Sequence, residues 1–348
     1  MRRAKAPDSA RQSGRRRGRV RIEDVAALAG VSPITVSRVL RTPALVSEEA
    51  RGRVEAAIER LGYVPNLAAG TLASQRSRLV AVIVPTLRSS VYATTIQGLS
   101  DELNGSGYHL MVGYAGYSAE LELQLLRAFL GRQPEGVVLT GVEHEPETRR
   151  LLRARQLPTV EIWDVTDDPI DVVVGFDNEA AGASIAEHFA RTGVRRAAVL
   201  CGHPTGEHRG RKRVAGFEAR CLALGLEAPA TEFIGDGMST MEAEQGLARL
   251  MTRAPDLEAI FCVNDTLAIA GLMEARRRAI DVPGRLRIVG FGDFDLAGHT
   301  APRLTTVRLP GYEIGRRAAR RILDRLDGVP DVQPVEDLGF QLVIRESA

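Results

Sequence analysis

From residue 79 to the end of the chain, short apolar runs alternate with stretches of helical periodicity, and this alternation restricts the possible folds more than any other feature. The first set of runs is LVAVIVP, HLMVGYA, EGVVLTG, PTVEIWD and VVVGF, and a second set begins near residue 196 with RAAVLCG, TEFIG, AIFCVND and RIVGFGD. Near-continuous apolar strands separated by helices predict parallel sheets that are covered on both faces. Two such sets predict two doubly wound lobes.

The predicted α/β body spans residues 78–348. LTTVRLP and a later strand near 335–344 are expected to cross back between the lobes. We therefore place the first lobe at about 78–177 and 308–334, and the second at about 178–307 and 335–348. Because sheets of this kind bind ligands beyond the carboxyl ends of their strands, a ligand is expected in the cleft between the lobes.

The head of the chain, residues 21–65, has a different pattern, which predicts three short helices. Gly30 is suited to end the first helix with positive φ, Ser32 to cap the second, and Pro33 to occupy its first turn. Ser47 is suited to cap the third helix. Helices joined by such tight turns predict a helix-turn-helix unit, which places its second helix in the major groove of DNA.

The second helix of the head has a polar outer face that a purely structural helix would not need. Helical spacing directs Val36, Val39 and Leu40 inward, so that Arg38 and Ile34 lie outside. Arg38 is suited to a bidentate pair with guanine, and Ile34 to contact with a thymine methyl group. The hydroxyl side chains are suited to phosphate oxygens. The candidate DNA-contacting residues of the head are Ser32, Pro33, Ile34, Thr35, Ser37 and Arg38.

The charge distribution supports a polyanionic partner for the head alone. Residues 1–70 contain 14 basic and seven acidic residues, a balance of +7, whereas the other 32 basic and 37 acidic residues give −5. A basic head on an acidic body indicates that only the head meets nucleic acid. Residues 1–20 are expected to be a disordered basic arm. An arm that contacts nucleic acid and an arm that is merely solvated are equally good interpretations.

IEDVAALAGVSPITVSRVL and VSEEARGRVEAAIERLGYVPNLAA resemble the head of the lactose/galactose-repressor family of bacterial transcription regulators, and the resemblance continues through the body. It implies that residues 66–77 are a hinge, which becomes helical when two subunits sit on an operator. Leu72 would then wedge between base pairs in the minor groove, an insertion whose unstacking cost is offset by contacts on kinked DNA. The hinge residues expected to contact DNA are Asn66, Ala68 and Leu72.

Candidate effector-binding residues follow from strand ends and from the resemblance. The helix that begins after Pro85 could hydrogen-bond an oxyanion or hydroxyl with its N-terminus. The resemblance implies that Arg213 grips the effector and that the Asn-Asp pair after AIFCV contacts it, although a helix cap is a second interpretation of Asp265. The candidates are Ser89, Ser90, Val91, Tyr92, Asp164, Arg213, Asn264, Asp265, Gly292 and Asp293.

Position 292 departs from the family pattern. Many members carry an Asp there that binds sugar hydroxyls, whereas this chain reads VGFGDFD and has Gly292. Loss of a carboxylate removes repulsion toward an anionic ligand, and Arg213 is a suitable partner for a carboxylate. Several stretches, among them VGFDNEAAG and FCVND, resemble regulators of gluconate utilisation. Together these features predict a sugar acid such as gluconate, with a bulkier neutral sugar as the alternative.

The sequence predicts a homodimeric, cytoplasmic repressor that needs no cofactor. The direction of the response is open, because relatives of the purine type use a corepressor. A secreted solute-binding protein is the rival from another class, but the DNA-reading head and the absence of an apolar leader oppose it. No enzyme motif or paired-cysteine metal spacing occurs, so neither catalytic nor metal-binding residues are expected. Cys201, His203 and His208 lie close in sequence, but we interpret them as part of a loop.

Overall fold

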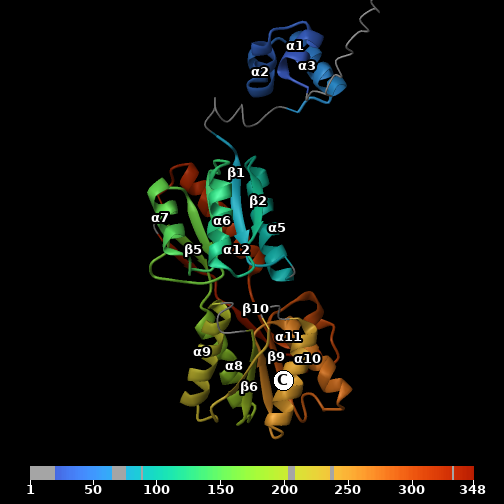
Figure 1. The fold of residues 1–348 in the computed structure, drawn as a ribbon, viewed down its shortest axis with the longest axis vertical. Helices are drawn as coiled ribbons and strands as arrows, with labels where there is room; N and C mark the ends of the chain where they lie inside the picture. Colours follow the sequence, from blue (N-terminus) through green and yellow to red (C-terminus); the bar gives the residue numbers. More distant parts are fainter. Residues whose placement is uncertain (1–19, 65–75, 88, 203–207, 236–238, 331–332) are drawn as a thin grey trace, which may run out of the picture. The chain divides into compact units, whose positions relative to one another are not determined.

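The computed structural model describes residues 20–64, 76–87, 89–202, 208–235, 239–330 and 333–348. The chain divides into two compact units, residues 1–76 and 77–348 (Figure 1).

The first unit is a helix-turn-helix built from α1 (Ile22–Ala29), α2 (Pro33–Arg41), the short 3-10 helix η1 (Pro43–Leu45) and α3 (Glu48–Leu61). Gly30 ends α1 with φ of 65°, as predicted. A small apolar core joins the helices, with Val25, Val36 and Val54 fully buried at its centre. These three side chains come from three different helices, so this core fixes how the helices of the unit pack against one another.

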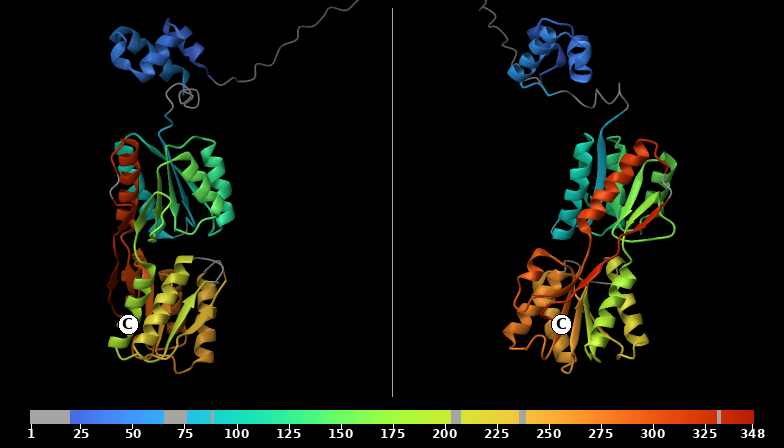
Figure 2. Two further views of the ribbon diagram at one scale, coloured as in Figure 1. Left: turned by 90° about the vertical axis from the view of Figure 1, so that its left-hand side faces the viewer. Right: turned by 180° about the vertical axis from the view of Figure 1, so that it is seen from behind.

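The first lobe of the second unit contains a six-stranded sheet in the order β11-β5-β4-β3-β1-β2, with all pairs parallel. Figure 2 shows α12 along one face of this sheet, and α5 packs beside it, while α6 and α7 cover the other face. The elements are β1 (Leu79–Val84), α5 (Ser90–Gly105), β2 (His109–Tyr114), α6 (Ala119–Leu130), β3 (Gly136–Thr140), α7 (Pro146–Arg155), β4 (Thr159–Ile162), β5 (Val172–Gly175), α12 (Gly311–Leu326) and β11 (Val335–Asp337).

The second lobe repeats the plan with the order β12-β10-β9-β8-β6-β7, in which only β12 is antiparallel to its neighbour. Helices α8 and α9 pack together, as do α10 and α11. The elements are α8 (Asn178–Arg191), β6 (Ala197–Cys201), α9 (His208–Ala223), β7 (Ala230–Phe233), α10 (Thr240–Arg253), β8 (Ala259–Cys262), α11 (Asp265–Arg277), β9 (Arg287–Gly292), η2 (Asp295–Gly298), β10 (Thr305–Arg308) and β12 (Gln341–Val343).

The chain passes between the lobes after β5, after β10 and after β11. The predicted lobe boundaries put these passages at 177/178, 307/308 and 334/335. The third differs, because Val335–Asp337 pairs with β5 of the first lobe, so the chain returns to the second lobe at 338–340 rather than at 334/335. The predicted single strand near 335–344 is therefore two short strands in different sheets.

Two glycines allow α8 and α9 to approach closely. A Cβ atom at Gly182 would lie 2.8 Å from the carbonyl carbon of Arg213, and one at Gly216 would lie 2.7 Å from the carbonyl carbon of Glu179. Any larger residue at either position would push the helices apart. This close packing fixes the position of the Arg213 backbone relative to α8.

Candidate functional site

The exposed face of α2 is the candidate DNA-reading surface of the first unit. The Oγ atom of Ser32 caps the helix by accepting a hydrogen bond from the Thr35 N–H at 3.2 Å, and Pro33 occupies the first turn. Ile34 and Arg38 are exposed one turn apart, and Ile34 is 70% exposed. An apolar side chain beside a guanidinium on one helix face can contact a thymine methyl group and a guanine edge.

Two leucines of the head are exposed, and for one of them, Leu40, helical spacing predicts an inward side chain. Leu40 is 39% exposed rather than inward, because it follows buried Val39 by about 100° around the helix and falls on its flank. Leu45 in η1 is 73% exposed, and a three-residue turn offers no periodic signal that could have identified it. The basic arm up to residue 19 and the hinge residues Asn66, Ala68 and Leu72 lie outside the described residues.

A cavity of about 320 Å³ lies between the two lobes of the second unit, at the carboxyl ends of β1, β4, β8 and β9. Its position matches the expected cleft. Both lobes contribute hydroxyl and aromatic side chains, and the second lobe adds the amide of Asn264. The lining residues are Pro85, Thr86, Ser89, Val91, Tyr92, Tyr114, Gly116, Tyr117, Trp163, Arg213, Ser239, Thr240, Asn264, Thr266, Phe291, Gly292, Phe294 and Leu309.

Six of the ten predicted effector residues line this cavity: Ser89, Val91, Tyr92, Arg213, Asn264 and Gly292. Ser90, Asp164, Asp265 and Asp293 do not belong to the lining. Asn264 also caps α11, since its Oδ1 accepts a hydrogen bond from the Leu267 N–H at 3.0 Å. The cap of α11 is therefore Asn264 and not Asp265, which is the first residue of the helix.

Arg213 is the cation of the cavity, and its position is fixed on several sides. Its Nε donates to Asn178 Oδ1 at 3.0 Å and its Nη1 donates to the Val263 carbonyl at 2.8 Å. The guanidinium also lies 4.2 Å from the centre of the Phe291 ring, a cation–π contact. These two bonds and the ring contact together orient the Arg213 guanidinium.

Asp164 serves the cavity indirectly. It is completely buried, and its Oδ2 accepts a hydrogen bond from Lys212 Nζ of the other lobe at 2.9 Å. Its Oδ1 accepts from Asn178 Nδ2 at 3.2 Å, and Asn178 in turn holds Arg213. The strand end predicts that this carboxylate contacts the effector. In the structure the carboxylate instead binds Lys212, which precedes Arg213 on α9, and Asn178, which accepts a hydrogen bond from Arg213.

The other two predicted carboxylates hold the loop after β9. Asp265 is buried and accepts hydrogen bonds from the Thr306 hydroxyl at 2.6 Å and the Phe294 N–H at 2.7 Å. Burial raises the pKa of Asp265 to about 6, although these hydrogen bonds act to lower it. Asp293 forms ion pairs of 2.6 Å with Arg308 and with Arg345. Sequence spacing could not separate these roles from ligand contact, because both carboxylates do follow strand ends.

Sequence reasoning missed several residues of the cavity wall. Trp163 follows β4 with φ of 73°, and its ring centre lies 5.2 Å from that of Tyr92. Its Nε1 donates to Thr95 Oγ1 at 3.2 Å. Tyr117 and Phe294 come from loops, where periodicity carries no information. PTVEIWD did indicate a strand end, but it drew attention to the carboxylate rather than to the indole beside it.

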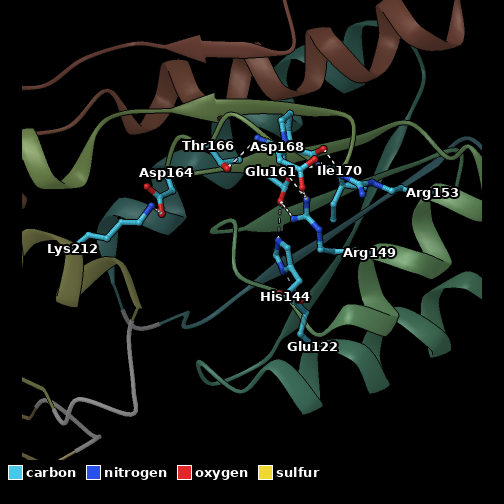
Figure 3. A network of polar contacts seen from close by, with 11 residues as sticks. Glu122, His144, Arg149, Arg153, Glu161, Asp164, Thr166, Asp168, Ile170 and Lys212 are labelled. Atoms are coloured by element: carbon cyan, nitrogen blue, oxygen red, sulfur yellow. Dashed lines mark hydrogen bonds and ion pairs between the residues drawn. The ribbon is translucent and has the colours of Figure 1, made fainter.

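A second polar cluster lies in the first lobe, next to a separate cavity of about 640 Å³ that its His144 and Glu122 help to line (Figure 3). His144 is buried, with Nδ1 2.7 Å from Glu122 Oε1 and Nε2 3.4 Å from Glu161 Oε1. Glu161 also lies 3.5 Å from Arg149. Burial by itself lowers the pKa of His144, but contact with Glu122 and Glu161 outweighs it and raises the pKa to about 9.

The three cysteines are buried and free, as the absence of paired spacing predicts. Burial raises the pKa of both Cys201 and Cys221 to about 12, which makes them poor nucleophiles and metal ligands at neutral pH. Within the described residues, no cluster of three or more His, Cys, Asp or Glu side chains could hold a metal ion. None of the helices in the described ranges combines the length and apolarity that a bilayer span requires.

Two known families match the chain, one within each of the two units of the structure. Residues 21–66 match the family "Bacterial regulatory proteins, lacI family", and residues 186–348 match the family "Periplasmic binding protein-like domain". The chain is 36% identical over 331 residues to the HTH-type transcriptional regulator GntR of Pseudomonas aeruginosa, an alignment that covers 95% of this chain and 96% of the relative.

Solved structures agree in fold. A LacI-family transcriptional regulator from Silicibacter pomeroyi superimposes with a TM-score of 0.88 at 34% identity, covering 94% of this chain and 99% of that one. The transcriptional regulator CelR in complex with cellobiose gives a TM-score of 0.68 at 28% identity, covering 95% of this chain and 100% of that one. The relatives found are transcription regulators and not enzymes.

Proposed function

Since the chain belongs to the lacI family of bacterial regulatory proteins, and is therefore a DNA-binding transcriptional regulator, we propose that it is a repressor released from its operator by a sugar acid such as gluconate. The effector binds in the 320 Å³ cavity between the lobes. Ligand changes the angle between the lobes and thereby disturbs the pairing of heads on a near-palindromic operator. By linkage, operator DNA must weaken effector binding by the same factor.

The observation that carries the sugar-acid proposal is the charge of the cavity wall. Arg213 lines the cavity and brings a fixed positive charge to it. A guanidinium in the wall attracts an anionic ligand, and its planar fork of N–H donors matches a carboxylate. The hydroxyl groups of Ser89, Thr86 and Ser239 can bind the hydroxyls of the same ligand.

The neutral-sugar alternative rests on space at Gly292, and the surroundings of this residue oppose it. The Phe294 ring occupies the volume that a side chain at 292 would take. The cavity is also near the lower end of the roughly 300–1,000 Å³ typical of ligand sites, which favours a compact ligand over a disaccharide. A corepressor response is the opposite outcome of the same binding event, and the operator experiment below distinguishes the two.

We assign DNA reading to the exposed face of α2. Arg38 reads a guanine and Ile34 a thymine methyl group, while Pro33 lies against the DNA backbone and the hydroxyls of Ser32, Thr35 and Ser37 contact phosphates. A solute-binding protein would have no use for this unit, which is why we set that alternative aside. Asn66, Ala68 and Leu72 remain our candidates for minor-groove contacts. The regulator acts where the chromosome is, in the cytoplasm.

The active species in this proposal is a homodimer, because two heads are needed for two half-sites. Exposed apolar side chains on the edge strands support this assembly: Val112 on β2 and Phe233 on β7. Sedimentation velocity tests it directly. Val112→Glu should shift the full chain toward the monomer, and a wild-type chain that sediments as a monomer at micromolar concentration would contradict it.

Calorimetric titration of the full chain with gluconate and with glucose tests the effector class. We expect saturable binding of gluconate and at least ten-fold weaker binding of glucose, which has the same carbon number but no carboxylate. Binding of a neutral sugar, while gluconate and other aldonates all fail to bind, would refute the sugar-acid proposal. The family assignment would survive that result.

A further inference from the structure

The loop after β9 has an unusual backbone that only certain residues can adopt. Gly292 has φ of 129° and Asp293 has φ of 50°, so two consecutive residues lie in the left-handed half of the map. Glycine adopts the first conformation without steric cost, whereas any other residue would be strained there. This backbone turns Phe294 back toward the cavity that Gly292 also lines.

Charged contacts hold this loop in place. Asp293 is paired with Arg308 and Arg345, and the Phe294 N–H donates to the buried carboxylate of Asp265 at 2.7 Å. The backbone around Phe294 is therefore anchored on both sides. Its ring is half-buried and lines the cavity.

Gly292 and the Phe294 ring are mutually dependent. A Cβ atom on residue 292 would overlap Cε1 of the ring and lie 2.8 Å from its Cδ1. A side chain at 292 and an aromatic ring in this position therefore exclude each other. A carboxylate at 292 would displace the ring, and the ring in turn keeps the carboxylate out.

We propose that Phe294 is a specificity-determining residue, whose ring forms the apolar wall against the carbon chain of the effector in the place where a side chain at 292 would stand. The inference deepens the proposed function and rests on it. Arg213 supplies charge, and Phe294 supplies a flat apolar surface suited to C–H groups. A ligand that carries both a carboxylate and a short carbon chain, such as an aldonate, satisfies both.

Fluorescence of Trp163 offers a direct test, because this residue is the only tryptophan of the chain and lines the cavity. Gluconate, glucose and cellobiose should be titrated into the full-length wild type, Phe294→Ala and Leu296→Ala. Leu296 is a matched control, since it is an exposed apolar residue of η2, two positions after Phe294, and lies outside the lining. We expect gluconate to bind Phe294→Ala more weakly than wild type by a factor of roughly ten or more. Leu296→Ala should bind gluconate with the affinity of the wild type.

The outcomes separate this inference from the proposed function. Gluconate binding that is equal in wild type and Phe294→Ala overturns the inference and leaves the proposed function intact. If only a neutral sugar binds the wild type, and Phe294→Ala weakens that binding, the sugar-acid proposal fails and the inference stands. If none of the three ligands binds the wild type, both fail.

A second measurement tests the exclusion between positions 292 and 294 without any ligand. Gly292→Ala should lower the thermal unfolding midpoint by several degrees, and adding Phe294→Ala should restore part of this loss. The recovery is partial, because alanine remains strained at φ of 129°. Strictly additive effects of the two substitutions would show that the ring does not occupy the space beside Gly292, and would overturn the inference.

Discussion

Arg213 donates from Nε to the side-chain oxygen of Asn178 at 3.0 Å, and this bond orients the one cation that lines the cavity among the described residues. Asn178 is held in turn by the carboxylate of Asp164, which also binds Lys212. The chain of contacts crosses from one lobe to the other. An effector that binds Arg213 therefore acts on a group already coupled to the relative position of the lobes.

Asn178→Ala should weaken gluconate binding about ten-fold, since a buried hydrogen bond to a charged group contributes about 1.5–3 kcal/mol. Operator affinity without effector should stay within two-fold of wild type. Asn104→Ala on α5 is the control, because the Asn104 amide donates to the Ser100 hydroxyl on the same helix and the residue is exposed to solvent. Unchanged gluconate affinity in Asn178→Ala would show that the bond does not position Arg213.

Arg213→Ala should abolish the response to effector and leave operator binding intact. Arg213→Lys keeps the charge but loses the planar fork, so we expect an intermediate affinity for gluconate. Electrophoretic mobility shift with and without gluconate measures both properties in one titration. Loss of operator affinity equal to that of a head variant would contradict this assignment.

Arg38→Ala should relax the base preference of the operator by about 1–3 kcal/mol at one position, while total affinity for random duplex falls less. Arg51→Ala is a suitable control, since its side chain lies 3.9 Å from Glu48 and 3.7 Å from Glu55 in α3. Competition between single-base variants of the selected operator gives the preference. If Arg38→Ala lowered the affinity for every single-base operator variant by the same factor, Arg38 would contact a phosphate and not a base.

Gly182→Ala should lower stability by about 1–3 kcal/mol, because the added methyl group meets the backbone of Arg213 and the helices cannot separate without cost. It should also weaken gluconate binding, since Arg213 moves with α9. Gly105→Ala provides a control, as nothing lies within 4 Å of its Cβ position. Differential scanning calorimetry measures the first effect. Equal unfolding midpoints for the two variants would disprove the close approach.

The His144 cluster predicts a pH dependence of stability. The pKa of His144 is raised to about 9 from its ordinary value of 6.5, so its contribution is fully present below about pH 6.5 and is lost as the pH rises through about 9. Between pH 7 and 9.5 this amounts to about 2 kcal/mol. Denaturant unfolding of His144→Gln, which cannot titrate, should show a correspondingly smaller loss over that range. Parallel curves for the two proteins would place the titrating group elsewhere.

The architecture followed from the sequence because its signals are local and repeated. Apolar strands, capping residues such as Ser32 and Ser47, and the glycine after α1 each specify their own element. The strand-end rule directed attention to the edge of the sheets where the cavity lies. It could not tell which of several strand-end side chains face inward, because that depends on contacts between residues distant in sequence.

Four predicted effector residues lie outside the cavity lining and illustrate this limit: Ser90, Asp164, Asp265 and Asp293. Asp164 forms an ion pair with Lys212. Asp293 forms ion pairs with two arginines, and one of them, Arg345, is 52 residues away in the chain. Only three-dimensional proximity reveals such partners. Gly292 was recognised as a departure, but its consequence, the placement of the Phe294 ring, depends on a backbone conformation that no sequence pattern encodes.

The central claim is that an effector-sensing body controls a DNA-reading head. Selection of bound duplexes from a random pool by the full chain, repeated with gluconate present, tests it most directly. The account predicts enrichment of a near-palindromic site, with affinity falling steeply as salt increases, and loss of that enrichment when gluconate is added. Failure to prefer any duplex over random DNA at physiological ionic strength, with or without gluconate, would contradict it.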